Sequence, residues 1–167
     1  MAVTSLSRGT LSVLACPPAL CPHAEFAVAG VLAQPVALTW TPQSAHPGVL
    51  RAGLAWQGRA GSGILLAGAL RRVGPLCFEV VEAATPGCDA ERFSFVPDLG
   101  MHRVTLAAHG DAMIGEEELR AIVCGAASVA EVAHRLDRTL GSAWDAALEP
   151  LRRAADGHPV GVLRHTG

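Results

Sequence analysis

Hydrophobic positions near the start of the chain change their spacing between two adjoining segments. Residues over Thr10–Cys16 alternate and are β-prone, which is typical of a strand. After two prolines, an apolar run with helical character extends over Pro22–Ala33 and stops before Gln34-Pro35. The chain is therefore predicted to begin with a strand followed by a helix.

The next segment predicts two strands, a second helix and another strand. A polar connection rich in turn formers, Pro42–Gly48, joins the two strands, and Gly74-Pro75 ends the helix. The order β-α-β-β-α-β is the split βαβ (ferredoxin-like) arrangement, in which right-handed crossovers place both helices on one face of an antiparallel sheet. The elements are Val36–Thr41, Val49–Gln57, the helix Ser62–Arg72 with Ile64, Leu65, Ala67 and Leu70 as its buried stripe, and Leu76–Glu82.

The second half of the chain predicts two more strands and then helices only. Arg92–Val96 and Arg103–Ala108, hinged at Pro97–Gly100, would extend the sheet. Three helices follow. The first covers Glu116–Cys124, the second begins with a capping box at Ser128–Glu131, and the third covers Ser142–Ala155. We expect an α+β fold with a ferredoxin-like sheet region over 1–112 and a C-terminal helical layer over 113–167. The helical stripe is too small to close a core alone, so we expect one structural unit; it comprises Val132, Leu136, Leu140, Trp144, Leu148 and Leu151.

Composition and charge restrict the classes of function. The chain has 167 residues, of which 50% are hydrophobic, and this suits one globular domain. A net charge of −2 and 4% aromatic residues disfavour nucleic-acid binding. No apolar run reaches the length of about 18 residues that a membrane span needs. Five scattered cysteines show neither a disulfide framework nor a Cys-x-x-Cys pair, so we expect a cytoplasmic protein without metal or cofactor.

The segment around Cys21 carries the clearest candidate chemistry. Cys21 is a candidate N-cap with Pro22 at the first helical position, where unsatisfied amides and the helix dipole lower a thiol pKa. His23, within one turn, would lower it further, which makes Cys21 a candidate nucleophile. No third catalytic residue and no oxyanion donor accompany them, which favours a structural cap or a packed thiol. Glu25 would pair with His23 or, as we expect, face solvent.

Three other groups have both a chemical and a structural interpretation. His109 and Asp111 flank a glycine, as in a small catalytic turn, but this is also the composition of an ordinary turn. The loop Gly58–Gly63 could hold an anion at a helix N-terminus, yet it lacks the phosphate-loop and dinucleotide patterns and is predicted to be a flexible loop. Trp40 and Trp56 would line a ligand surface or, as we expect, belong to the core.

Five segments of the chain form a recognisable pattern. They are Ala19–Leu32, Leu38–Gln43, Pro97–Gly100, His109–Asp111 and Leu140–Asp145. In order and spacing they resemble an actinobacterial family of small uncharacterised proteins, a domain of unknown function. The resemblance covers about Gly9 to Val162 and implies kinship without an activity. The chain departs from the pattern with Gly115 where proline is usual and with Phe93 and Phe95 where tyrosines are usual; the loss of the two hydroxyls weakens any acid–base role of Phe93 and Phe95.

These observations favour a non-enzymatic binding or regulatory module that acts on a protein partner. The alternatives are a small enzyme that uses Cys21 and His23, and a small-molecule sensor. The resemblance implies a link to fatty-acid synthesis, with an acidic acyl carrier protein or a carboxylase subunit as partner. The adjacent pairs Arg71-Arg72 and Arg152-Arg153 would receive an acidic surface, although arginine near a helix C-terminus also complements the dipole.

Overall fold

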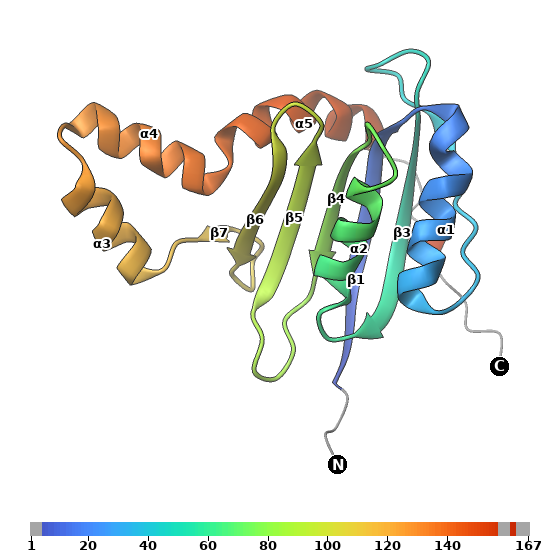
Figure 1. Cartoon of the computed structure of the whole chain (residues 1–167), viewed down its shortest axis with the longest axis horizontal. Helices are drawn as coiled ribbons and strands as arrows, with labels where there is room; N and C mark the ends of the chain where they lie inside the picture. The colour runs from blue at the N-terminus through green and yellow to red at the C-terminus, as the bar shows by residue number, and fades with distance from the viewer. Residues whose placement is uncertain (1–4, 157–160, 163–167) are drawn as a thin grey trace.

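The computed structural model describes residues 5–156 and 161–162 and has a mixed α+β fold (Figure 1). Its sheet runs in the order β2-β3-β1-β4-β5-β6-β7 with all these neighbours antiparallel, and β8 (Gly161–Val162) adds in parallel to β3. The strands are β1 (Leu6–Cys16), β2 (Thr41–Pro42), β3 (Leu50–Arg59), β4 (Cys77–Glu82), β5 (Ala90–Val96), β6 (Gly100–Leu106) and β7 (Ala112–Met113). The helices are α1 (Cys21–Leu32), α2 (Ser62–Arg71), α3 (Glu116–Gly125), α4 (Val129–Leu140) and α5 (Ser142–Ala155).

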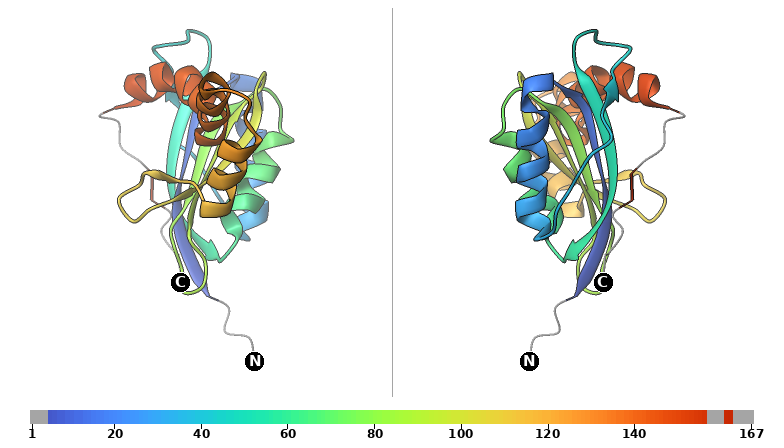
Figure 2. Two further views of the ribbon diagram at one scale, coloured as in Figure 1. Left: turned by 90° about the vertical axis from the view of Figure 1, so that its left-hand side faces the viewer. Right: turned by 90° about the vertical axis from the view of Figure 1, so that its right-hand side faces the viewer.

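The first half of the chain has the order β1-α1-β2-β3-α2-β4 and the spatial order β2-β3-β1-β4. This is compatible with the ferredoxin-like arrangement expected from the sequence, and α1 and α2 cover the same face of the sheet (Figure 2). One strand is much shorter than predicted, because β2 occupies only the end of Val36–Thr41 and the next residue. The carboxylate of Glu25 holds the preceding segment against α1, so its backbone does not extend the sheet.

The main core lies between the sheet and the helices α1 and α2. Alternating residues of β1, β3, β4 and β5 face inward, and Phe78 stacks on Phe95 with 5.2 Å between the ring centroids. Gly63, Leu66, Ala67 and Leu70 are the residues of α2 at helical spacing that point to this core. The prediction that Ile64 and Leu65 belong to the buried stripe is wrong, because both are exposed. The buried strand residues include Leu11, Val13, Leu54, Trp56, Phe78, Val80, Phe93 and Phe95.

Helix α5 covers one end of the opposite face of the sheet (Figure 2). Leu148 and Leu151 pack there against Leu14 and Ala15 of β1. Buried Gln43 ties the same layers together, since its Nε2 donates to the carbonyl oxygens of Leu14 at 2.8 Å and Leu151 at 3.3 Å. Strand β1 is therefore enclosed by helices on both faces at this end.

Helices α3 and α4 form a two-helix arm that extends past β6 rather than lying on the sheet (Figure 1). A compact joint fixes the arm where α4 passes into α5. His102 Nε2 bonds to the Thr139 carbonyl oxygen at 2.9 Å, and the indole N–H of Trp144 donates to the Gly100 carbonyl oxygen at 2.9 Å. Gly141 turns there with φ of 80°, and a Cβ at this position would lie 2.5 Å from the His102 ring. The helices expected over 113–167 thus divide into the covering helix α5 and the arm.

Removing the α5 contact should destabilise the whole chain. Leu148 is 0% exposed, so Leu148→Ala should lower the free energy of unfolding by about 2–5 kcal/mol. The matched control is Leu119→Ala on the exposed side of α3, which should cost less than about 1 kcal/mol. Urea unfolding should be followed by tryptophan fluorescence and far-ultraviolet circular dichroism. Coincident transitions are expected for one structural unit, and two separated transitions would contradict it.

Candidate functional site

The Cys21 thiol lies in a buried pair with Cys16 rather than at a helix cap. Leu20 is the N-cap residue of α1 and Cys21 is already in the helix, so the cap prediction is wrong. A 3₁₀ turn over Pro18–Leu20 runs directly into α1 and starts the helix one residue early. The Cys21 Sγ lies 3.7 Å from both the Cys16 Sγ and the Pro17 carbonyl oxygen.

This environment keeps at least one thiol of the pair protonated. Burial, the hydrogen bond between the two thiols and the negative charge of an ionised Cys21 raise the pKa of Cys16 from 9.0 to about 12. His23 is exposed on α1 while Cys21 is buried, and no hydrogen bond joins the two among the described residues. The contacts of Cys21 are those of a packed thiol.

Glu25 has a structural role that the sequence did not indicate. Its Oε1 accepts hydrogen bonds from the Leu38 backbone N–H at 2.8 Å and from the Trp40 indole N–H at 3.0 Å. The expectation that Glu25 faces solvent, and its alternative of pairing with His23, are both wrong. The carboxylate instead fastens the segment before β2 to α1, and it leaves half-buried Trp40 oriented toward the helix.

The other catalytic candidates lie apart from Cys21. His109 and Asp111 occupy the turn between β6 and β7, where the Nδ1 and Oδ2 atoms are 3.3 Å apart and the side chains are 71% and 83% exposed. Gly110 has φ of 93°, as a tight turn requires. This turn and α1 lie on opposite sides of the molecule (Figure 1), so the structure does not bring His109 and Asp111 to His23.

The glycine-rich loop before α2 holds an anion that belongs to the chain itself. Glu82, buried at the end of β4, accepts the N–H groups of Gly61 and Gly63 through its two carboxylate oxygens, each at 2.7 Å. A Cβ on Gly63 would lie 2.7 Å from the Glu82 Oε2, so glycine allows this approach. The flexible-loop interpretation is therefore wrong: the loop is an internal helix cap. Sequence reasoning missed Glu82, although it continues the inward alternation of Phe78 and Val80 and is an acidic residue in that series.

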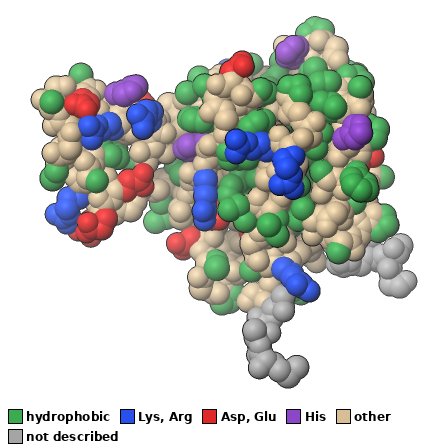
Figure 3. Space-filling view, viewed as in Figure 1, with side chains coloured by type: hydrophobic (Ala, Val, Ile, Leu, Met, Phe, Trp, Pro, Cys, Tyr) green, Lys and Arg blue, Asp and Glu red, His purple; other side chains and the backbone are tan. Residues whose placement is uncertain are grey.

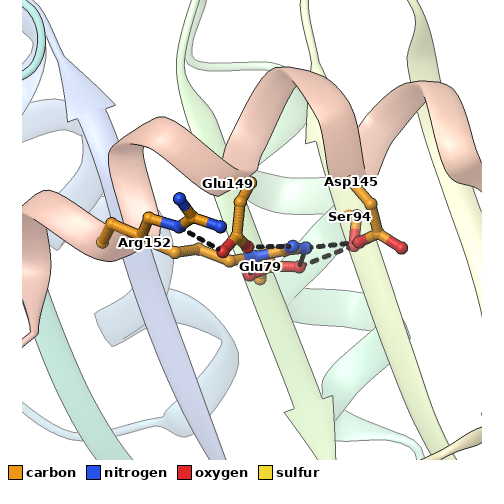
Figure 4. Close-up of polar contacts among 6 residues, drawn as sticks. Glu79, Ser94, Asp145, Glu149 and Arg152 are labelled. Atoms are coloured by element: carbon orange, nitrogen blue, oxygen red, sulfur yellow. Dashed lines mark hydrogen bonds and ion pairs between the residues drawn. The ribbon is translucent and has the colours of Figure 1, made fainter.

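Arg152 on α5 stands at the centre of an ion-pair network on the opposite face (Figure 4). Its Nε and Nη2 bind the two oxygens of Glu79 at 2.8 Å and 2.6 Å, and Nη2 also binds Asp145 at 2.8 Å. Ser94 donates to Glu79 at 2.9 Å, and Glu149 lies 3.5 Å from the Arg152 Nη1. The hydrogen bonds to Glu79 are the largest cause that raises the pKa of Arg152 above its ordinary value. Arg152 thus fastens α5 to the sheet.

Of the four arginines expected to receive an acidic surface, Arg71 and Arg72 have no ion-pair or hydrogen-bonding side-chain partner among the described residues. Both are exposed at the end of α2. Arg153 is also exposed, but it pairs with Glu149 at 2.8 Å. The pair Arg71-Arg72 is therefore available to a partner. The pair Arg152-Arg153 already forms ion pairs with residues of α5 and the sheet.

The outer surface of α1 and α2, which we call the α1/α2 face, is apolar. Phe26 is 82% exposed, Leu65 61% and Ile64 47%, and hydrophobic side chains gather over both helices in Figure 3. A groove of about 630 Å³ runs between the helices, with Leu20, His23, Phe26 and Val31 on one wall and Ala69, Arg72 and Val73 on the other. Trp56 lies in the core at 1% exposure, as expected, and does not contribute to this surface.

Neither a metal site nor a membrane-spanning helix is found in the part of the chain that the structure describes. Residues 5–156 and 161–162 contain no group of three or more His, Cys, Asp or Glu side chains placed to hold a metal ion. Within these residues, no helix has the length and hydrophobicity to cross a membrane.

Comparison with known proteins identifies a family and no activity. A family model described as a protein of unknown function, DUF3145, matches residues 10–165. No curated protein and no solved structure matches the chain.

Replacing Glu82 should test the internal cap. A glutamine side chain has one acceptor oxygen, so in Glu82→Gln the amide group would face one N–H donor of the loop. We expect the free energy of unfolding in urea to fall by about 2–3 kcal/mol. Exposed Glu117→Gln on α3 is the matched control and should change it by less than about 0.5 kcal/mol. Equal losses in the two variants would show that the cap does not stabilise the fold.

The raised pKa of Cys16 predicts a loss of stability in alkaline solution. Above pH 9 the thiol ionises more readily in the unfolded chain than in the folded one, so the stabilisation is complete below pH 9 and is lost as pH rises toward 12. Between pH 9 and pH 10.5, the free energy of unfolding should fall more steeply for the wild type than for Cys16→Ala, by up to about 1.4 kcal/mol per pH unit. Urea unfolding at several pH values measures both slopes. Equal slopes of unfolding free energy against pH in the two proteins would contradict the raised pKa of Cys16.

Proposed function

The chain belongs to the DUF3145 family of proteins of unknown function, and we propose that it is a non-enzymatic module that binds an acidic protein partner on the α1/α2 face. The observation that carries this proposal is an exposed phenylalanine beside an apolar groove, together with two arginines that have no ion-pair partner among the described residues. Phe26 lies on α1 at the groove between the two helices, and Arg71 and Arg72 lie where α2 ends.

The apolar area supports binding because soluble proteins seldom leave large neighbouring hydrophobic side chains in water without a use for them. Phe26, Ile64 and Leu65 are the exposed hydrophobics of the two helices. An aromatic side chain beside a groove is also the usual anchor of a protein interface.

The charge of the face indicates the kind of partner. The sequences of α1 and α2 contain one acidic residue, Glu25, and its carboxylate is turned to Leu38 and Trp40. Arg71 and Arg72 therefore act without a neutralising carboxylate on these helices, and His23 lines the same groove as Arg72. A partner with an acidic rim around apolar residues would complement this surface.

The link to fatty-acid synthesis that the family resemblance implies is part of this proposal. An acyl carrier protein with an acidic surface, or a carboxylase subunit, would supply a partner of the required charge. The enzyme alternative receives less support, because Cys21 is buried with Cys16 while His109 and Asp111 lie across the molecule.

Affinity capture from the protein's own cells, followed by titration calorimetry with each purified partner, tests the proposal. We expect a stoichiometric acidic protein, and a fall in affinity of about tenfold or more for Phe26→Ser and for the double variant Arg71→Glu/Arg72→Glu. The matched controls are Leu6→Ser, which alters an equally exposed apolar residue, and Arg59→Glu, which reverses an exposed charge at the end of β3.

The controls should bind as the wild type does. Binding that all four variants retain would place the partner on another surface and overturn the proposal. A small molecule that binds in place of a protein would support the sensor alternative instead.

A further inference from the structure

The α3–α4 arm exposes apolar residues that no part of the described structure covers. α4, described over its whole length, buries no residue fully, although Val129, Val132 and Leu136 recur at helical spacing. Val129 at the start of α4 is 87% exposed, and Val123 near the end of α3 is 53% exposed. Ile122 is the buried residue of α3. Two helices of this length cannot close a core between themselves, because each presents its apolar stripe to only one neighbour.

The joint at the base of the arm makes this exposure a fixed property of the fold. His102 and Trp144 hold the end of α4 and the start of α5 against β6, with their rings 5.0 Å apart. The ring of His102 fills the space above Gly141. The arm therefore cannot fold back onto the sheet without breaking two hydrogen bonds and a ring contact.

Charges on the arm are of both signs, and three of them are unpaired. A groove of about 470 Å³ separates α3 from α4, with Glu118 on one wall and His134 and Arg138 on the other. These three side chains form no ion pair or hydrogen bond within the described residues, whereas Glu116 pairs with Arg120, and Glu131 pairs with Arg135. Because Glu118 and Arg138 line the same groove, a twofold axis along the arm would place the acid of each copy opposite the base of the other.

We propose that the arm binds the arm of a second copy of this chain, side by side around a twofold axis that runs along the arm. In that arrangement α3 of one copy lies antiparallel to α4 of the other, and the four helices form an up-down bundle. Glu118 of each copy faces Arg138 of the other, and Val123 and Val129 pack at the tip. A partner of a single charge sign would leave either Glu118 or Arg138 unpaired, which is why a second copy fits the arm better.

Charge reversal at these two positions gives a sharp test. The variants are Glu118→Arg and Arg138→Glu, both at exposed positions. Each variant alone places like charges opposite one another in both contacts of the dimer, so its dissociation constant should rise by about tenfold or more. An equimolar mixture of the two variants restores opposite charges in both contacts. The double variant Glu118→Arg/Arg138→Glu restores them as well.

Sedimentation equilibrium at low ionic strength measures the mass. The wild type, the mixture and the double variant should reach twice the 17.2 kDa of one chain, while each single variant and Val129→Asp should stay monomeric at the same concentration. Circular dichroism checks that every variant is folded. The variant Arg71→Glu/Arg72→Glu should dimerise normally, which separates this result from the function proposed for the α1/α2 face.

Three outcomes would overturn the proposal. These are a wild type that stays monomeric up to millimolar concentration, single variants that dimerise as the wild type does, and a mixture that fails to recover the dimer mass.

Discussion

The carboxylate of Glu82 determines how the first helical layer faces solvent. By accepting the N–H groups of Gly61 and Gly63, it fixes both the first residue of α2 and the rotation of that helix on the sheet. Gly63 and Leu66 then point inward, and Ile64 and Leu65 point outward. A single buried charge satisfied by two amides thus produces an apolar outer surface that hydrophobic periodicity alone would have placed in the core.

Much of the fold could be predicted from the sequence because most elements have a clear period and clear ends. Proline and glycine residues mark the ends of α1 and α2. The predicted capping box is confirmed, since Ser128 Oγ accepts the Glu131 N–H at 3.2 Å. The errors arose where a side chain competes with the backbone pattern. Glu25 takes the Leu38 N–H, so a β-prone segment forms only a two-residue strand. Such contacts join residues distant in sequence, and local periodicity carries no information about them.

The same reason explains why the candidate site was predicted only in part. Residues with apparent chemistry, such as Cys21, Glu25 and the glycine-rich loop, form contacts inside the chain. Sequence alone could not distinguish the exposed Phe26 from a core residue. Nor could it distinguish Arg71 and Arg72, which lack a partner in the described part of the chain, from residues that cap a helix. The polar residues that suggested chemistry stabilise the fold instead. The exposed surfaces left over are apolar and carry a few charges without a partner among the described residues. Both interfaces that we propose use such surfaces.

The contact between His102 and Thr139 also determines how α4 ends. A carbonyl oxygen can only accept, so the His102 Nε2 is the donor. Thr139 lies in the last turn of α4, where carbonyl oxygens have no partner within the helix, and a side chain of β6 satisfies one of them. The sheet therefore completes the end of this helix, and the arm takes its direction from β6.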